Sequence, residues 1–139
     1  MIEVLLLDTN ALLWLSAGSE RLGPRARATI QDAIDAGTAT FSPISVWEAA
    51  MLVRKGRYTL GQPVAAWRLD LLDVGLEEAP LDGIAAVMAS TLDGMLEDPA
   101  DRFIVATAIR AGATLVTSDR RLIEWLGRSG SGNALDACS

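Results

Sequence analysis

A chain of 139 residues that is half apolar and 22% charged is long enough for one domain with a hydrophobic core, and it has no run of the about 20 apolar residues that cross a bilayer. It contains no histidine, which excludes Ser-His-Asp and Cys-His catalysis and histidine-ligated zinc. Its one cysteine, Cys138, cannot form an internal disulfide and favours a reducing, cytoplasmic setting. The net charge of −6 argues against a nucleic-acid partner unless cations neutralise clustered acids. The acidic residues Glu3 and Asp8 interrupt the first apolar run and argue against a secretory signal.

Apolar runs bounded by glycine, proline and capping residues predict short strands that alternate with helices. Strands are expected over Ile2–Leu7, Thr38–Phe41, Gly75–Leu81 and Ala113–Thr117. Helices are expected over Thr9–Ala17, Gly23–Ala36, Ser42–Val53, Pro63–Asp73, Asp82–Leu92, Asp98–Gly112 and Ser118–Leu126. This alternation predicts a three-layer α/β/α architecture with a mostly parallel sheet of four or five strands.

One domain is expected over residues 1–126. Residues 127–139, GRSGSGNALDACS, are rich in glycine and serine and predict either a flexible tail or a short edge strand at Ala134-Leu135.

Two aspartates follow apolar strands directly. Asp8 comes after the first strand, and Asp119 comes after the ATLVT strand, beside the hydroxyls of Thr117 and Ser118. Each aspartate is a good helix N-cap, which is a sufficient structural explanation for either residue alone. Because parallel sheets place their functional sites at the carboxyl ends of the strands, we also expect both side chains at the same edge.

Glu48 carries the only charge in the segment SPISVWEAAMLV. Ile44 and Leu52 lie one helical turn before and after it, so a helix that is apolar nearly all round would bury this carboxylate. A buried carboxylate needs a proton, a cationic partner or a metal. A buried ion pair with an arginine and a metal-binding role are both open at this point.

Three acids, Glu97, Asp98 and Asp101, fall within five residues at the start of a predicted helix. Asp98 suits the N-cap, and Asp101 suits the first turn, where acids complement the helix dipole. If Asp8, Glu48, Asp101 and Asp119 meet at one edge of the sheet, they form an all-oxygen site of the kind that Mg²⁺ or Mn²⁺ prefers.

Four short motifs in this order resemble PIN-domain ribonucleases, and within them the toxins of VapBC-type toxin–antitoxin pairs. The motifs are Asp8-Thr9-Asn10 after a hydrophobic strand, Ser45-Val46-Trp47-Glu48, Asp98-Pro99-Ala100-Asp101-Arg102, and Thr117-Ser118-Asp119. The resemblance covers residues 1 to about 126 and implies a single PIN-like domain. Many relatives carry a histidine two residues before the first aspartate of the third motif, where this chain has Leu96.

The resemblance implies a divalent-metal-dependent endoribonuclease that uses Mg²⁺ or Mn²⁺. Asp8, Asp101 and Asp119 would be metal ligands, and Glu48 a further ligand or the group that orients the attacking water. Asn10, Thr117 and Ser118 would hold these groups by hydrogen bonds. The family also implies an RNA substrate, a cognate antitoxin and a homodimer, with no membrane partner.

Arg54, Lys55 and Arg57 follow the Glu48 helix and are candidate RNA contacts, although cations are also favourable at any helix C-terminus. The four tryptophans could stack on bases, but core or interface packing is the preferred interpretation. Three alternatives are a nuclease for single-stranded DNA, a non-catalytic scaffold, and a phospho-accepting domain. The last is disfavoured because the single lysine, Lys55, does not follow a strand.

Overall fold

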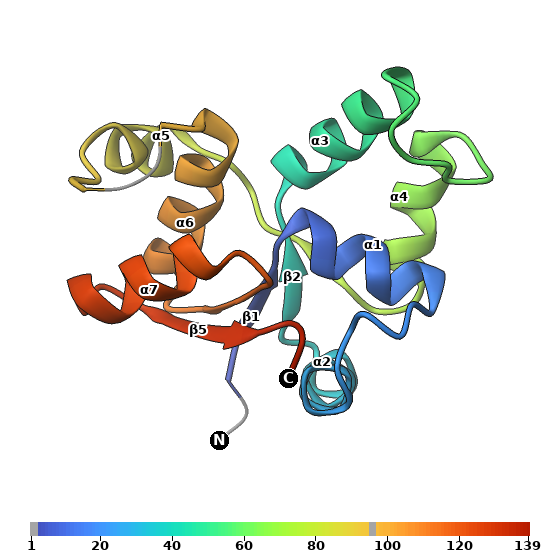
Figure 1. Ribbon diagram of the computed structural model, residues 1–139, viewed down its shortest axis with the longest axis horizontal. Helices are drawn as coiled ribbons and strands as arrows, with labels where there is room; N and C mark the ends of the chain where they lie inside the picture. The colour runs from blue at the N-terminus through green and yellow to red at the C-terminus, as the bar shows by residue number, and fades with distance from the viewer. Residues whose placement is uncertain (1–2, 95–96) are drawn as a thin grey trace.

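The computed structural model describes residues 3–94 and 97–139, in which a central sheet is covered by helices on both faces (Figure 1). The strands are β1 (Leu5–Leu7), β2 (Ala39–Phe41), β3 (Glu77–Glu78), β4 (Thr114–Thr117) and β5 (Asn133–Asp136). The helices are α1 (Thr9–Ala17), α2 (Pro24–Ala36), α3 (Pro43–Arg54), α4 (Val64–Asp73), α5 (Gly83–Ser90), α6 (Pro99–Ala111) and α7 (Arg120–Ser129). The three-layer α/β/α architecture predicted from the sequence is confirmed.

The sheet has the order β3-β2-β1-β4-β5, and every pairing is parallel. Leu7, the last residue of β1, is paired with Phe41 of β2 on one side and with Val116 of β4 on the other. The chain therefore builds outward in both directions from β1. In parallel sheets, the crevice outside the strand ends at such a reversal of order is where ligands bind.

Successive leucines of β1 face opposite layers. Leu5 and Leu7 are fully buried in the core formed with α1, α2 and α4, whereas Leu6 is buried in the core formed with α6 and α7. This alternation is the period of two of a strand, and it explains why the whole run LLL is apolar. The fixed orientation of β1 then aims Asp8 out of its carboxyl end.

Three predicted elements are shorter than expected. The strand predicted over Ile2–Leu7 begins at Leu5, and Ile2 lies outside the described residues. The strand predicted over Gly75–Leu81 is only the two-residue strand β3. The backbone N–H of Ala79 still donates to the carbonyl of Phe41 at 2.8 Å, but Pro80 has no N–H with which to continue the pairing. The helix predicted to reach Leu92 ends at Ser90. Arg102 of α6 donates to the carbonyls of Ala89 at 3.0 Å and Leu92 at 3.0 Å, which fixes the exit of the helix by a tertiary contact.

The C-terminal elements extend further than predicted. Helix α7 passes through Gly127 and ends at Ser129, because the left-handed residue that closes it is Gly130, with φ of 65°. Of the two alternatives for the tail, the structure has the edge strand: β5 pairs with β4 along its whole length. Beyond it, Ala137 is fully buried and accepts a hydrogen bond from Gly23 N at 2.9 Å.

Within residues 3–94 and 97–139, no helix combines the length and the apolar character needed to cross a membrane.

Candidate metal centre

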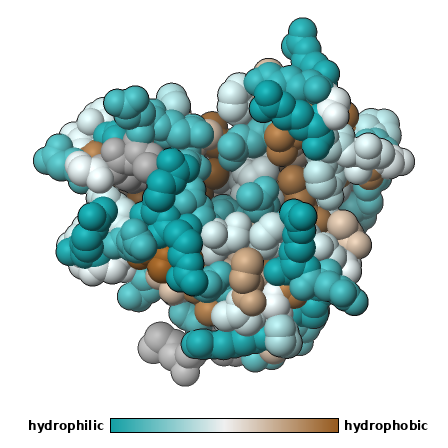
Figure 2. All heavy atoms as spheres, in the orientation of Figure 1, coloured by the Kyte–Doolittle hydropathy of each residue, from teal (hydrophilic) through white to brown (hydrophobic). Residues whose placement is uncertain are grey.

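A cleft of about 450 Å³ opens at the carboxyl edge of the sheet between α3 and α6. Figure 2 shows the surface hollowed at this place. Five carboxylates line it from separate parts of the fold: Asp8 after β1, Glu48 in α3, Asp98 and Asp101 at the start of α6, and Asp119 after β4. The structure thus brings the four acids singled out in the sequence to one place, with Asp98 beside them.

Three of these aspartates are also helix N-caps. Asp8 accepts from Ala11 N at 3.0 Å, Asp98 from Ala100 N at 2.9 Å, and Asp119 from Arg121 N at 2.9 Å. Capping and a role in the cleft are therefore not competing explanations. The N-termini of α1, α6 and α7 converge on the cleft, and their positive dipole ends offset part of the negative charge gathered there.

Thr117 links the two aspartates that follow strands. Its buried hydroxyl donates a short hydrogen bond to Asp8 Oδ2 and accepts one from the backbone N–H of Asp119 at 3.0 Å. Burial raises the pKa of Asp8 to about 6, and this hydrogen bond opposes part of that rise. The last residue of β4 therefore fixes the carboxylate at the end of β1.

Glu48 has no ion-pair partner in the part of the chain that the structure describes, so the predicted alternative of a buried pair with arginine is wrong there. Its Oε1 instead accepts a hydrogen bond from the Thr9 hydroxyl at 2.5 Å, and Thr9 Oγ1 lies 3.0 Å from the buried Ser45 Oγ. Burial raises the pKa of Glu48, and the bond from Thr9 opposes the rise.

Helix α3 itself is not buried, which corrects the expectation from its apolar sequence. Only Ser45 and Ala49 are buried in it, and Trp47 is 57% exposed. Val46 and Leu52 pack against one core cluster and Ile44 against the other, while Met51 and Trp47 line the cleft, and Glu48 is half-buried at the cleft wall.

Asp101 lies in the first turn of α6, half-buried, and accepts no hydrogen bond from any residue within 3–94 and 97–139. Burial, followed by the nearby charges of Asp98, Glu48, Asp119 and Asp8, raises the pKa of Asp101 to about 7. Asp101 is thus the carboxylate most exposed to like-charge repulsion and least committed to other partners. A cation in the cleft would relieve that repulsion.

The donor chemistry of the cleft fits a hard divalent cation, since carboxylate oxygens are the ligands that Mg²⁺ and Mn²⁺ prefer. Among the described residues, however, no three acidic side chains are close enough to form a closed cage. Mg²⁺ does not require one, because it commonly keeps several waters and uses one or two carboxylates. The arrangement therefore fits a cation held partly through water, with Asp101 and its neighbours as ligands.

The other predicted site residues are distributed unevenly. Asn10, Lys55 and Arg57 line the cleft, whereas Ser118 and Arg54 are not among its lining residues. Leu96, the position where relatives carry histidine, lies outside the described residues. Sequence reasoning missed Thr9 as the partner of Glu48 and Ser45 as the partner of Thr9, although both belong to the quoted motifs, one directly after Asp8 and the other three residues before Glu48.

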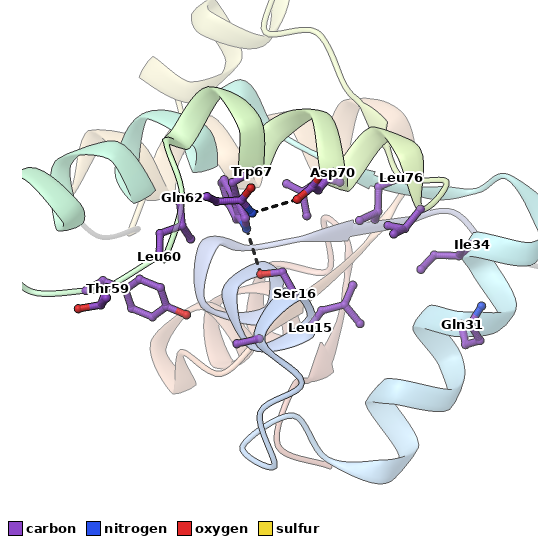
Figure 3. Close-up of a pocket in the computed structure, with 14 residues that line it drawn as sticks. Leu15, Ser16, Gln31, Ile34, Thr59, Leu60, Gln62, Trp67, Asp70 and Leu76 are labelled. Carbon is purple, nitrogen blue, oxygen red and sulfur yellow. Dashed lines mark hydrogen bonds between the residues drawn. The ribbon is translucent and has the colours of Figure 1, made fainter.

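A second hollow, of about 380 Å³, lies between α1, α2, α4 and the segment before α4 (Figure 3). Leu15, Ile34, Leu60 and Leu76 line it, and Asp70 is its one acid among the described residues. Two hydrogen bonds cross it, from Trp67 Nε1 to Ser16 Oγ at 3.0 Å and from Gln62 Nε2 to Asp70 Oδ2 at 3.0 Å. This hollow lacks the carboxylate cluster and offers an apolar surface.

The sheet is all-parallel, and the acidic cleft lies outside the strand ends where the strand order reverses. These two features together define the class of protein. The PIN-domain family model matches residues 5–125, and the chain belongs to that family. Among curated proteins, it is similar to Ribonuclease VapC22 of Mycobacterium tuberculosis, with 36% identity over 121 residues, which are 87% of this chain and 91% of the relative.

Solved structures share the fold at lower identity. A complex of VapBC2 from Rickettsia felis with promoter DNA contains a chain that is 19% identical, with a TM-score of 0.69, covering 95% of this chain and 97% of that one. FitAcB from Neisseria gonorrhoeae contains one that is 18% identical, with a TM-score of 0.63, covering 96% and 98%. At these identities the likeness is one of fold.

Proposed function

We propose that this chain is a divalent-metal-dependent endoribonuclease that acts as the toxin of a toxin–antitoxin pair in the cytoplasm. The observation that carries the proposal is the meeting of Asp8, Glu48, Asp101 and Asp119, from four separate segments, at one cleft. RNA as the substrate class is supported by the relative named Ribonuclease VapC22. Nucleases of this family generally use a divalent cation, and we propose Mg²⁺ or Mn²⁺ here.

The proposed roles follow from how each side chain is held. Asp101, which has no competing hydrogen bond in the described chain, is the principal ligand, with Asp8 and Asp119 completing the site directly or through water. Thr117 fixes Asp8, while Thr9 aims Glu48 into the cleft. Glu48 is then placed to orient the attacking water and accept its proton.

A bound divalent cation supplies charge neutralisation of the phosphodiester and makes water a stronger nucleophile. The chain's own acids cannot bind RNA by themselves, because uncompensated carboxylates repel phosphate. Since water is the nucleophile, cleavage does not need the ribose 2′-hydroxyl, and the products should carry a 5′-phosphate and a 3′-hydroxyl.

A cognate antitoxin and a homodimer are further parts of the proposal. The neighbours of known structure include VapBC2 and FitAcB assemblies, which supports an antitoxin for this chain. The exposed apolar side chains of α5, Ile84 at 61% and Val87 at 67%, offer surface to a second copy. Co-purification with the product of a neighbouring reading frame tests the antitoxin, and sedimentation equilibrium tests the dimer.

The direct test is cleavage of total RNA by the purified chain with and without Mg²⁺ or Mn²⁺, compared with Asp8→Asn. We expect metal-dependent cleavage with the stated end groups, and its loss in the variant. A single-stranded DNA substrate runs in parallel. Cleavage of DNA alone would replace the substrate assignment, and absence of metal-dependent cleavage of either substrate would leave a non-catalytic scaffold.

A further inference from the structure

Trp47 differs from the other tryptophans of the chain. Trp67 and Trp125 are buried, and their indole N–H groups donate to Ser16 Oγ and to the carbonyl of Asp93, each at 3.0 Å. Trp14, on α1, is partly buried and packs against the core cluster that contains Leu5 and Leu7. Trp47 belongs to neither core cluster, is 57% exposed, and its indole N–H has no acceptor within residues 3–94 and 97–139. The described contacts therefore give the Trp47 side chain no structural role in the isolated chain.

Trp47 also lies at the site, since it lines the acidic cleft and is the immediate neighbour of Glu48. Met51 and Lys55 follow at intervals of four residues and line the same cleft, so the three form a row along α3. Eight residues of helix place the Cα atoms of Trp47 and Lys55 about 12 Å apart. Helix α3 thus contributes an aromatic-to-basic row to the cleft, whereas four of the cleft's five acids come from other parts of the fold.

The basic end of this row is available to a ligand. Neither Lys55 nor Arg57 forms an ion pair with any described residue, although five acids line the same cleft. Both side chains are exposed at the C-terminal end of α3. An exposed aromatic ring next to unpaired cations is the combination that single-stranded nucleic acids use, with bases stacked on the ring and phosphates on the cations.

From this arrangement we infer that Trp47 is a stacking platform for an unpaired base of the RNA substrate, next to the scissile phosphate, with Lys55 and Arg57 holding a neighbouring phosphate. The inference rests on the proposed ribonuclease function and specifies its substrate as single-stranded at the cut. It also assigns different roles to the basic residues, because Arg54 does not line the cleft and makes no contribution.

The inference is tested by fluorescence anisotropy with a labelled oligouridylate in Ca²⁺, a hard cation that can neutralise the acidic cleft, with gel analysis confirming that the oligonucleotide stays intact. Trp47→Ala should weaken binding about tenfold, and Trp47→Phe should restore most of it, because stacking depends on the ring. Lys55→Ala with Arg57→Ala should weaken binding and flatten its salt dependence. Leu69→Ala is the matched control, since Leu69 is 56% exposed on α4 and lies outside the cleft.

A series of oligouridylates, each with one abasic position, locates the contact. Wild type should lose affinity at one position, and Trp47→Ala should be insensitive there. Equal binding by wild type and Trp47→Ala, or no binding by wild type in Ca²⁺, would overturn the inference. So would a change from dimer to monomer in Trp47→Ala, because it would assign the ring to a second copy. None of these results bears on metal-dependent RNA cleavage by wild type, which separately decides the proposed function.

Discussion

The acidic cleft between α3 and α6 and the hollow between α1, α2 and α4 are of similar size, about 450 and about 380 Å³. They differ in how their polar groups are satisfied. In the hollow, Trp67 and Gln62 each donate to a nearby acceptor, and Asp70 is the one acid among the described lining residues. In the cleft, carboxylates crowd together, and burial with like charge raises the pKa of Asp8 to about 6 and of Asp101 to about 7.

The two regions show that cavity volume does not identify the functional site of this fold, whereas uncompensated negative charge does. Capping accounts for three of the five acids one by one, but bringing all five to one edge adds like-charge repulsion that a cation or a proton relieves. The hollow is explained by packing and two hydrogen bonds, whereas the crowding of Glu48 and Asp101 against the capping aspartates points to a ligand. Paired substitutions in the two regions can break or sharpen this contrast.

The largest effect is expected for the two aspartates Asp101 and Asp70. Asp101→Asn should lower metal-dependent RNA cleavage by about a hundredfold or more, because the carboxylate with no other described partner is lost. Asp70→Asn in the hollow should leave cleavage unchanged. Initial rates at saturating Mg²⁺ for both variants measure the difference, and equal rates would remove the distinction between the regions.

The next effect concerns Thr117, which joins Asp8 to Asp119. Thr117→Val keeps the volume but removes the hydroxyl, so we expect metal affinity to fall by about 10–100-fold. Thr117→Ser should recover most of the affinity. If valine and serine behave alike in a Mn²⁺ titration, the hydroxyl does not hold the site.

Thr9 and Ser16 provide a matched pair of hydroxyls, one at each region. Thr9→Val should reduce cleavage about tenfold by releasing Glu48, and it should also cost some stability because the buried Ser45 hydroxyl loses its partner. Ser16→Ala removes the acceptor of Trp67 Nε1 and should lower the free energy of unfolding by about 1–2 kcal/mol, with cleavage unchanged. Urea unfolding and cleavage rates on both variants separate the two outcomes, and the reverse pattern would contradict the assignment.

The smallest effect is on the pH dependence of stability without metal. Because folding raises the pKa of Asp101 to about 7 from its usual 3.8, the folded chain binds a proton that the unfolded chain does not between these values. Stability should therefore fall as pH rises through about 7. In EDTA at pH 8, Asp101→Asn should be more stable than wild type by about 1 kcal/mol, and this advantage should vanish near pH 4. Thermal melts at both pH values measure it.

Local sequence rules located most of the fold. Caps at Asp8, Asp98 and Asp119 and left-handed glycines at helix ends are encoded within a few residues, so α1, α2 and α6 fall close to the predicted bounds. Local rules were insufficient where distant residues decide. Arg102 takes the carbonyls at the end of α5 and shortens the predicted helix, and pairing with β4 selects the edge strand from the two alternatives predicted for the tail.

The same division holds for the site. The acids could be predicted because strand ends and helix starts place them at one edge. The contacts that fix them could not be predicted from local sequence, because Thr9 meets Glu48 across 39 residues and Thr117 meets Asp8 across 109. The exposure of Trp47 likewise depends on which face of α3 the rest of the fold leaves uncovered.

The central claim is that the carboxylates of the cleft bind a divalent cation. Isothermal titration of Mn²⁺ into wild type, Asp101→Asn and Asp70→Asn tests it most directly, without reference to RNA. The account predicts saturable binding by wild type and by Asp70→Asn, and binding at least about tenfold weaker by Asp101→Asn. Indistinguishable isotherms for the three proteins would contradict it.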